Sequence, residues 1–237
     1  MVGDKQSIRP GFSSTRIVVR SALEKTSEAD TAQELKGKTL AGPARASFGT
    51  FVVAEFLKRH GMALSDVNYV ELPFPSMLAA LTNGAIDGAV MIEPFLSQAL
   101  RSGAAKPLSD PSAYLPAGVS VVPLVYSESF ARDRARAQAF MTAYMQGVRL
   151  YNDAFVKGRD RDKVIAVIAH RANVSPMLIR YGFLPALDPN QHVDKSFLAA
   201  AQAFFIEQGM LQGKADIDTL VDASFAEAAV RELGEYH

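Results

Sequence analysis

The sequence predicts an α/β fold in which strands and helices alternate around a parallel sheet. Residues 37–95 show this most clearly, because short extended segments at 38–41, 68–72 and 89–92 alternate with segments of helical spacing. Strands separated by helices of about ten residues are typical of βαβ units, whose strands run parallel. With 49% hydrophobic and 21% charged residues, the 237-residue chain can also bury a core.

Capping and turn signals bound the helices of this region. Ser47 is an N-cap candidate for a helix that should stop near Gly61. The next helix is expected over 77–81, and Asn83-Gly84 form a good C-terminal stop. Pro94 can open a third, short helix after the last strand. Each helix therefore begins directly after a predicted strand.

The second half of the chain has a mainly helical pattern. Apolar residues recur every three or four positions over 130–156, which predicts one long helix. Residues 106–116 contain three prolines and are expected to form a loop or an edge strand. The further helices expected here lie at 162–171, after Ser175, around Phe197–Phe204 and after Asp218.

Composition and missing motifs argue against several functions. Lys plus Arg and Asp plus Glu both number 25, and this balance gives no reason to expect nucleic acid as a partner. The chain has no cysteine, which excludes disulfides and cysteine nucleophiles, and its four histidines lack metal-ligand spacing. We therefore expect no catalytic residue, no metal and no cofactor, and a protein that is not an enzyme.

Candidate site residues are expected to gather at one edge of the sheet. In open α/β sheets, ligands lie at the carboxyl ends of the strands, where helix N-termini present unpaired N–H groups. Ser47 to Thr50 follow the first strand, Phe74 follows the second and Glu93 follows the third. A small polar solute at this edge would meet hydroxyls, amides, an aromatic ring and one carboxylate.

Several short motifs resemble one protein family. They are KGK at 36–38, SFGT at 47–50, LP at 72–73, AALTNGAIDG at 79–88, EPF at 93–95 and DASFAEAAVRELG at 222–234. In order and spacing they are similar to ABC transporter substrate-binding proteins of the NMT1/THI5-like family, the SsuA/TAUA-like proteins for nitrate, sulfonates and taurine. The resemblance covers the chain after about Ile8.

The resemblance implies a periplasmic-binding-protein-like (type II) α/β architecture with two lobes. Residues 38–118 would form lobe 2, a complete βαβαβ unit. Residues 1–37 would be a remnant of lobe 1 with a hinge strand, and 119–237 the return hinge strand and the helix-rich part of lobe 1. Segments 16–20 and 119–126 are the strands that we expect to cross between the lobes.

The resembled family begins with a signal peptide and a first βαβα half-lobe, and we recognise neither in this sequence. We therefore expect a truncated lobe, and an oligomer if a partner chain supplies the absent wall of the site. The other implied partners are a small-molecule solute and an ABC permease with its ATPase, so any membrane association would be through the permease. The implied location is the periplasm.

Each candidate ligand-binding residue after the first two strands also has a structural interpretation. Ser47, Phe48, Gly49 and Thr50 fit a binding site for a polar head group, and they fit an ordinary capped helix start equally well. Phe74 fits either stacking on a planar ligand or packing in the core. The residues alone leave both interpretations open.

The same holds for the candidates near the hinge and the third strand. Glu93 fits contact with an amine, an amide or a hydroxyl of the ligand, and it also fits a structural carboxylate that pairs with a cation or caps a helix. Ser13 and Ser14 lie where the incoming strand would pass the cleft, and their alternative is a polar loop.

The absence of catalytic motifs favours a binding protein that closes on a small polar or zwitterionic organic solute of the sulfonate, taurine-like or pyrimidine-precursor class. One alternative is a THI5-like pyrimidine biosynthetic enzyme. Fungal relatives of that type use histidine and a cysteine cluster, so a cysteine-free chain argues against it. A regulator domain would need a helix-turn-helix segment, and a truncated remnant would bind nothing.

Overall fold

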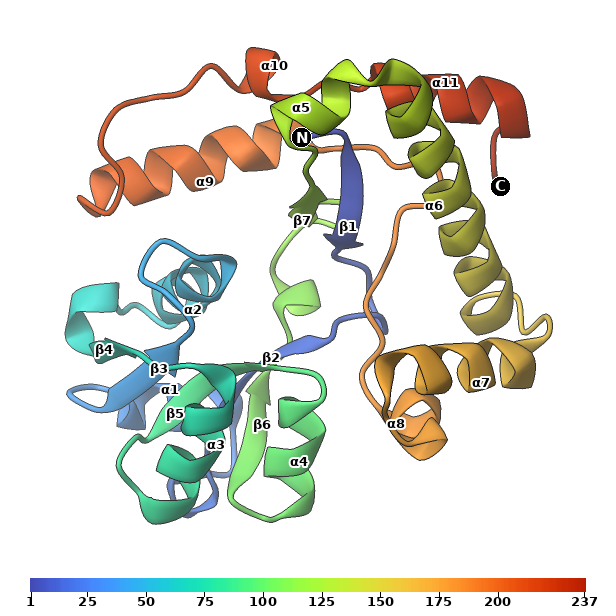
Figure 1. Ribbon diagram of the computed structural model, residues 1–237. Helices are drawn as coiled ribbons and strands as arrows, with labels where there is room; N and C mark the ends of the chain where they lie inside the picture. The colour runs from blue at the N-terminus through green and yellow to red at the C-terminus, as the bar shows by residue number, and fades with distance from the viewer.

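The structure is a computed structural model that describes residues 1–237, and it confirms the α/β class (Figure 1). A five-stranded sheet has the order β4-β3-β5-β2-β6, and β1 and β7 form a separate two-stranded sheet. The strands are β1 (Gly3–Ser7), β2 (Thr15–Arg20), β3 (Thr39–Gly42), β4 (Asn68–Glu71), β5 (Gly88–Ile92), β6 (Ala105–Ser109) and β7 (Ser120–Leu124). The helices are α1 (Glu28–Glu34), α2 (Phe48–Arg59), α3 (Phe74–Asn83), α4 (Phe95–Arg101), α5 (Glu128–Arg132), α6 (Arg134–Phe155), α7 (Arg161–Ala172), α8 (Pro176–Tyr181), α9 (Lys195–Glu207), α10 (Ile217–Leu220) and α11 (Ser224–Leu233).

The centre of the five-stranded sheet is parallel, as predicted. β3 pairs in parallel with β4 and β5, so that Leu40 lies opposite both Tyr69 and Gly88. β2 pairs antiparallel with β5, with Thr15 opposite Ile92, and β6 pairs antiparallel with β2. The sheet is therefore mixed rather than wholly parallel, and its edge strand β6 contains one of the prolines of the segment that we expected to be a loop or an edge strand.

Strand β2 does not cross between lobes, in contrast to the expectation for 16–20. Its residues Ile17, Val18 and Val19 are almost fully buried. Ile17 and Val19 belong to the core cluster on one face of the sheet and Val18 to the cluster on the other, which is typical of a central strand covered on both faces. The two sheets are instead connected by residues 8–14 and 110–119, and β7 lies wholly in the two-stranded sheet.

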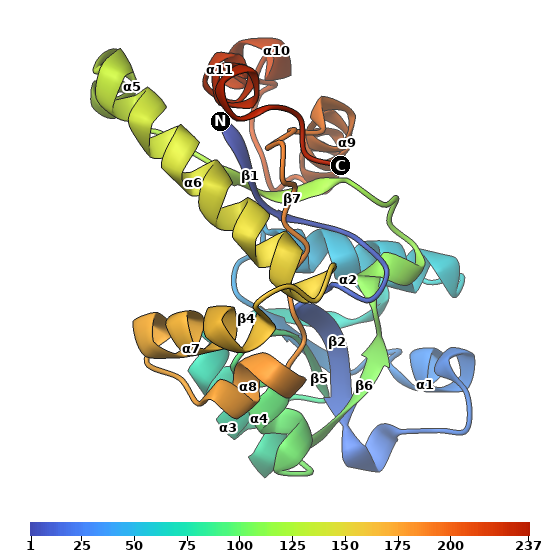
Figure 2. The same cartoon turned by 90° about the vertical axis from the view of Figure 1, so that its right-hand side faces the viewer.

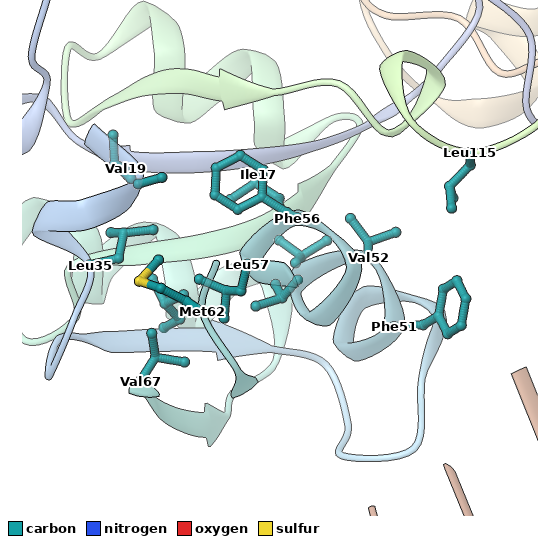
Figure 3. Close-up of a cluster of buried hydrophobic side chains, with 14 of the residues drawn as sticks. Ile17, Val19, Leu35, Phe51, Val52, Phe56, Leu57, Met62, Val67 and Leu115 are labelled. Atoms are coloured by element: carbon teal, nitrogen blue, oxygen red, sulfur yellow. The ribbon is translucent and has the colours of Figure 1, made fainter. Parts of the chain in front are cut away.

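Helices cover both faces of the five-stranded sheet. On one face, α1 and α2 build the core cluster that includes Phe56 and Leu57 (Figure 3). On the other face, α3 and α4 contribute Met77, Leu81 and Leu96, all of which are fully buried. Burial of one such side chain contributes about 1.5–3 kcal/mol, so these two layers hold the strand ends and the helix starts in fixed positions.

A third apolar cluster lies beside the two-stranded sheet. Met141 and Met145 of α6 pack with Phe225 and Ala229 of α11 and with Val2, which immediately precedes β1. Helix α6 runs diagonally from the α5 end of the molecule toward α7 (Figure 2). The C-terminal helix α11 thus joins α6 to the N-terminal end of the chain.

The long helix expected over 130–156 is divided at Asp133. The Asp133 side chain accepts a hydrogen bond from the backbone N–H of Arg136, 3.2 Å away, and so caps α6. The residues before it form the short helix α5. None of the helices, α6 included, combines the length and the apolar character that a bilayer crossing requires.

The lobe boundaries at 1–37, 38–118 and 119–237 stay a prediction that these contacts refine. Strand β2 and helix α1 precede residue 38, yet Leu35 and Leu40 pack in the same core cluster and β2 lies within the five-stranded sheet. We therefore propose that lobe 2 extends from β2 to β6 and that lobe 1 contains the two-stranded sheet with α6 and α11.

Helix α9 lies along α2, although it belongs to the C-terminal part of the chain (Figure 1). The Phe51 ring lies 5.3 Å from the rings of both Phe197 and Phe204, in edge-to-face arrangements. Phe197 also lies 6.5 Å from the ring of Phe48 at the start of α2. The C-terminal part therefore also packs against the five-stranded unit, at the core cluster to which Ile8 and Leu115 of the connecting segments belong.

Candidate functional site

The structure places most of the predicted site residues at one edge of the five-stranded sheet. Strands β3, β4 and β5 are parallel, so their carboxyl ends lie at the same edge. Strand β2 begins at this edge, and the Glu93 N–H donates a hydrogen bond to the Ser14 carbonyl oxygen, 3.3 Å away. Ser13, Ser14 and Glu93 are therefore neighbours in space.

At the start of α2, two hydroxyls bind the turn that precedes the helix. Ser47 accepts a hydrogen bond from the Thr50 N–H (3.3 Å) and donates to the Ala44 carbonyl oxygen (2.8 Å). The buried Thr50 hydroxyl also donates to Ala44 O (2.8 Å) and is hydrogen-bonded with the Tyr69 hydroxyl (3.1 Å). Ser47 is therefore a helix cap. Its hydroxyl is used within the protein, so any ligand contact here would involve backbone groups instead.

Two backbone N–H groups at the start of α2 have no acceptor within the protein. These belong to Phe48 and Gly49, the first two residues of the helix, whereas the next N–H, of Thr50, binds Ser47. Free N–H groups and the helix dipole favour negative charge or a polar oxygen at this position. This pair of donors is the part of the α2 start that has no partner within the protein, with Phe48 half-buried and Gly49 buried.

Gly49 lies in a closely packed place. A Cβ atom at this position would lie 3.3 Å from Pro43 Cδ and 3.5 Å from Val90 Cβ. Because Val90 belongs to β5, this close approach places the start of α2 beside the strand that carries Glu93. Gly42 has a similar constraint, since the Tyr69 hydroxyl occupies the place of its missing side chain.

The Glu93 carboxylate has three donors within the protein. It accepts hydrogen bonds from the Ser97 hydroxyl (2.6 Å), the Ser97 N–H (3.2 Å) and the Phe183 N–H (2.8 Å). Glu93 also lines a cavity of about 200 Å³ with Phe183 and Pro185, and the other predicted site residues are not part of its wall. Glu93 therefore has a structural role, in addition to any contact that it makes with a ligand.

The remaining predicted residues differ in their accessibility. Ser13 and Ser14 are buried, and the Ser13 hydroxyl donates to the Thr15 carbonyl oxygen at 3.1 Å. Phe74 stacks on Phe95 at 6.0 Å between centroids and packs against the α3–α4 core. The structure thus brings Ser13 and Ser14 close to Glu93, whereas the Phe74 ring packs with Phe95 against the α3–α4 core.

Sequence reasoning overlooked Arg16, a largely buried cation at the same edge. Its Nη1 donates to the Ser13 and Thr15 carbonyl oxygens, its Nη2 pairs with Asp110 at 2.9 Å, and its guanidinium lies 4.7 Å from the Phe183 ring centroid. Burial lowers the pKa of Arg16, and Asp110 and Glu93 oppose this shift. A charged residue within the apolar segment TRIVVR is the signal that would have found it.

No cluster of three or more His, Cys, Asp or Glu side chains in residues 1–237 is arranged to hold a metal ion. The groups that the structure gathers at the edge are backbone N–H groups, hydroxyls, one carboxylate and one arginine. Such groups can bind and orient a small polar molecule.

Comparison with known proteins agrees with this architecture. The SsuA alkanesulfonate-binding protein from Xanthomonas axonopodis pv. citri, bound to MOPS, is 20% identical with a TM-score of 0.68, over 93% of this chain and 73% of its own. The nitrate-binding protein NrtA from Synechocystis PCC 6803 is 15% identical with a TM-score of 0.68, over 94% and 66%. The desulfurization enzyme DszB is 16% identical with a TM-score of 0.60, over 98% and 79%.

At these identities the similarity shows the fold. None of the curated proteins matches the sequence. The model of the NMT1-like family matches residues 4–169, which is more than half of the chain. On this match, the chain belongs to the NMT1-like family.

Proposed function

We propose that this protein is the solute-binding component of an ABC importer and binds a small polar or zwitterionic organic solute of the sulfonate, taurine-like or pyrimidine-precursor class between two lobes. The observation that carries the proposal is the pair of N–H groups of Phe48 and Gly49, which have no acceptor and lie at the sheet edge of Ser14 and Glu93. Such donors bind the oxygens of a polar head group.

The proposed ligand-binding residues remain those predicted, with their roles divided by the contacts described above. Phe48 and Gly49 would donate backbone N–H groups, while Ser47 and Thr50 hold the turn in place. The others lie on the same sheet edge and would act at its margins or as supports: Ser13, Ser14, Phe74 and Glu93.

The connectivity supports a two-lobed receptor. Residues 8–14 and 110–119 connect the two sheets, and paired connections of this kind allow hinge closure around a ligand. By analogy with the SsuA and NrtA proteins, whose names state alkanesulfonate and nitrate binding, we propose a periplasmic location and delivery to an ABC permease and its ATPase.

Two alternatives have specific support. DszB shares the fold and is an enzyme, so a catalytic member of this architecture exists, although the absence of cysteine argues against a THI5-like chemistry that needs a cysteine cluster. A remnant that binds nothing is favoured by the internal hydrogen bonds of Ser47, Thr50 and Glu93.

A paired substitution tests the N–H donors. Phe48→Pro removes the N–H at the first helical position, where proline fits, and the extended backbone of Ser47 (φ −134°, ψ 162°) is compatible with a following proline. Phe48→Ala is the matched control, because it loses the same ring contacts and keeps the N–H. We expect Phe48→Pro to bind the solute about tenfold more weakly than Phe48→Ala, as for loss of one hydrogen bond to a charged group.

The measurement is calorimetric titration after a thermal-shift screen of taurine, alkanesulfonates, aromatic acids and pyrimidine precursors. Equal affinities of the two variants would remove the α2 start from the site. Turnover of any of these compounds would favour the enzyme, and the absence of any binding would favour the remnant.

A further inference from the structure

Arg9 lies in the segment 8–14 that connects the two sheets. The turn from Arg9 to Phe12 is closed by a hydrogen bond from the Phe12 N–H to the Arg9 carbonyl oxygen (2.9 Å), and Pro10 and Gly11 (φ 78°) occupy its central positions. This is the arrangement of a type II turn. The Arg9 guanidinium carbon lies 4.1 Å from the Phe12 ring centroid, so the turn also holds the guanidinium against the ring.

Two guanidinium nitrogens of Arg9, Nε and Nη2, are buried and have no hydrogen-bond acceptor. These two N–H groups point to the same side of the planar guanidinium, and together they match the spacing of two oxygens on one carboxylate or sulfonate. The contact with the Phe12 ring compensates part of the lost hydration, but the two buried N–H groups themselves have no acceptor, which is unfavourable. An anion with two oxygens would supply both acceptors.

The surroundings of Arg9 connect it to the candidate site. Tyr151 lies close by, and its hydroxyl donates a hydrogen bond to the Pro185 carbonyl oxygen at 2.8 Å. Burial raises the pKa of Tyr151 while the charge of Arg9 opposes that shift, as expected for neighbours. Pro185 in turn lines the cavity of about 200 Å³ that Glu93 also lines. Arg9 is not part of the wall of this cavity and is linked to it only through Tyr151 and Pro185.

We infer that Arg9 is a binding site for an oxyanion with two acceptor oxygens, a sulfonate or carboxylate group, held by Nε–H and Nη2–H. The inference deepens the proposed function, on which it rests for the identity of the solute, by assigning its acidic end to the connecting segment. Because both nitrogens are buried, binding of the anion requires a local movement that uncovers them.

Thermal unfolding in the presence of simple oxyanions tests this site. We would compare low millimolar sodium sulfate or methanesulfonate with sodium chloride at equal ionic strength, using the full chain and the variants Arg9→Gln, Arg9→Lys and Arg101→Gln. Arg101 is an exposed arginine at the end of α4 and serves as the control for general salt effects. In chloride, Arg9→Gln should keep the fold, because the Nε and Nη2 groups have no acceptor to lose and only the contact with the Phe12 ring is removed.

The expected result is an oxyanion-dependent rise of the unfolding midpoint in the wild type and in Arg101→Gln, at least tenfold weaker apparent affinity in Arg9→Gln, and an intermediate response in Arg9→Lys, which keeps the charge without the two-point geometry. An equal response in Arg9→Gln and wild type, or no response beyond chloride in any protein, would overturn the inference. Loss of folding of Arg9→Gln in chloride would do the same, since it would show that Arg9 already has a partner.

The outcome is separable from that of the proposed function. A protein that responds to sulfate through Arg9 and binds none of the organic solutes keeps the anion site and loses the receptor function. A protein that binds an organic sulfonate or carboxylate with the same affinity in Arg9→Gln keeps the receptor function and loses the anion site.

Discussion

The Glu93 carboxylate accepts a hydrogen bond from the Phe183 N–H, 2.8 Å away, and thereby ties the end of β5 to the segment that follows α8. The same carboxylate binds the N–H and the hydroxyl of Ser97 in the first turn of α4. One side chain at the proposed site thus connects two parts of the chain that are 90 residues apart.

We expect Glu93→Ala to lower the free energy of unfolding by about 1–3 kcal/mol, because it leaves the Phe183 and Ser97 donors without their acceptor. Urea unfolding without ligand measures this change. Glu235→Ala is the matched control, since Glu235 is exposed and makes no ion pair. Unchanged stability combined with lost solute binding would instead make Glu93 a ligand-contacting carboxylate.

Alanine substitutions at Gly182 and at Gly147 should change the free energy of unfolding in opposite directions. A Cβ atom at Gly182 would collide with the Leu178 carbonyl oxygen and lie 3.0 Å from Glu93 Oε1, so we expect Gly182→Ala to cost about 1–3 kcal/mol. Gly147 lies within α6 with no atom near its Cβ position, so Gly147→Ala should stabilise by about 0.5–1 kcal/mol. Urea midpoints of the two variants check both signs, and a neutral Gly182→Ala would show that the segment after α8 is free to shift.

The Ser47 side chain should contribute to stability mainly as a helix cap. We expect Ser47→Ala to cost about 1 kcal/mol and Ser47→Gly only a few tenths, the difference that N-cap positions usually show. Thermal unfolding of both variants measures this. If Ser47→Gly instead loses as much stability as Ser47→Ala, the hydrogen bond to Ala44 O would be the larger contribution.

Asp4 should make stability depend on pH between about 4 and 6. Burial raises its pKa from 3.8 to about 6, against the hydrogen bond from the Asp188 N–H. Between these values the folded protein binds a proton that the unfolded chain does not, so Asp4 destabilises the fold at neutral pH and this cost disappears as the pH falls through 6 toward 4. Relative to Asp4→Asn, wild-type stability should rise by up to about 3 kcal/mol from pH 7 to pH 4.

Urea unfolding of the wild type and of Asp4→Asn at several pH values measures the difference in their free energies of unfolding. Taking the difference cancels the contributions of the other carboxylates. A constant difference across the range would mean that Asp4 keeps its charge in the fold. Asp4→Asn is suitable because it preserves the acceptor for the Asp188 N–H.

The βαβ pattern of lobe 2 could be predicted because its signals are local. Ser47 does cap α2, Gly84 does end α3 in a left-handed conformation, and β3, β4 and β5 are parallel. Strand β1 could not be found in this way, because its sequence GDKQS has no apolar alternation and its partner β7 lies more than a hundred residues away. The position of β2 in the sheet likewise depends on its pairing with the distant strands β5 and β6.

For the same reason, only part of the candidate site could be predicted from the sequence. Its location at the strand ends follows from local patterns, and the structure brings Ser14 and Glu93 together there. The internal partners of Glu93 and the unpaired nitrogens of Arg9 depend on residues 183–185 and on the path of the connecting segment. Local sequence contains no information about such contacts.

The edge-to-face contacts of Phe51 with Phe197 and Phe204 have a mechanical consequence. Residues 8–14 and 110–119 link the two sheets, and a rotation of one part against the other would also have to separate these rings. Aromatic pairs of this kind contribute about 0.5–1.5 kcal/mol each beyond their buried area. In a two-lobed receptor of the kind proposed, the contact between α9 and α2 would therefore contribute to the free-energy cost of opening.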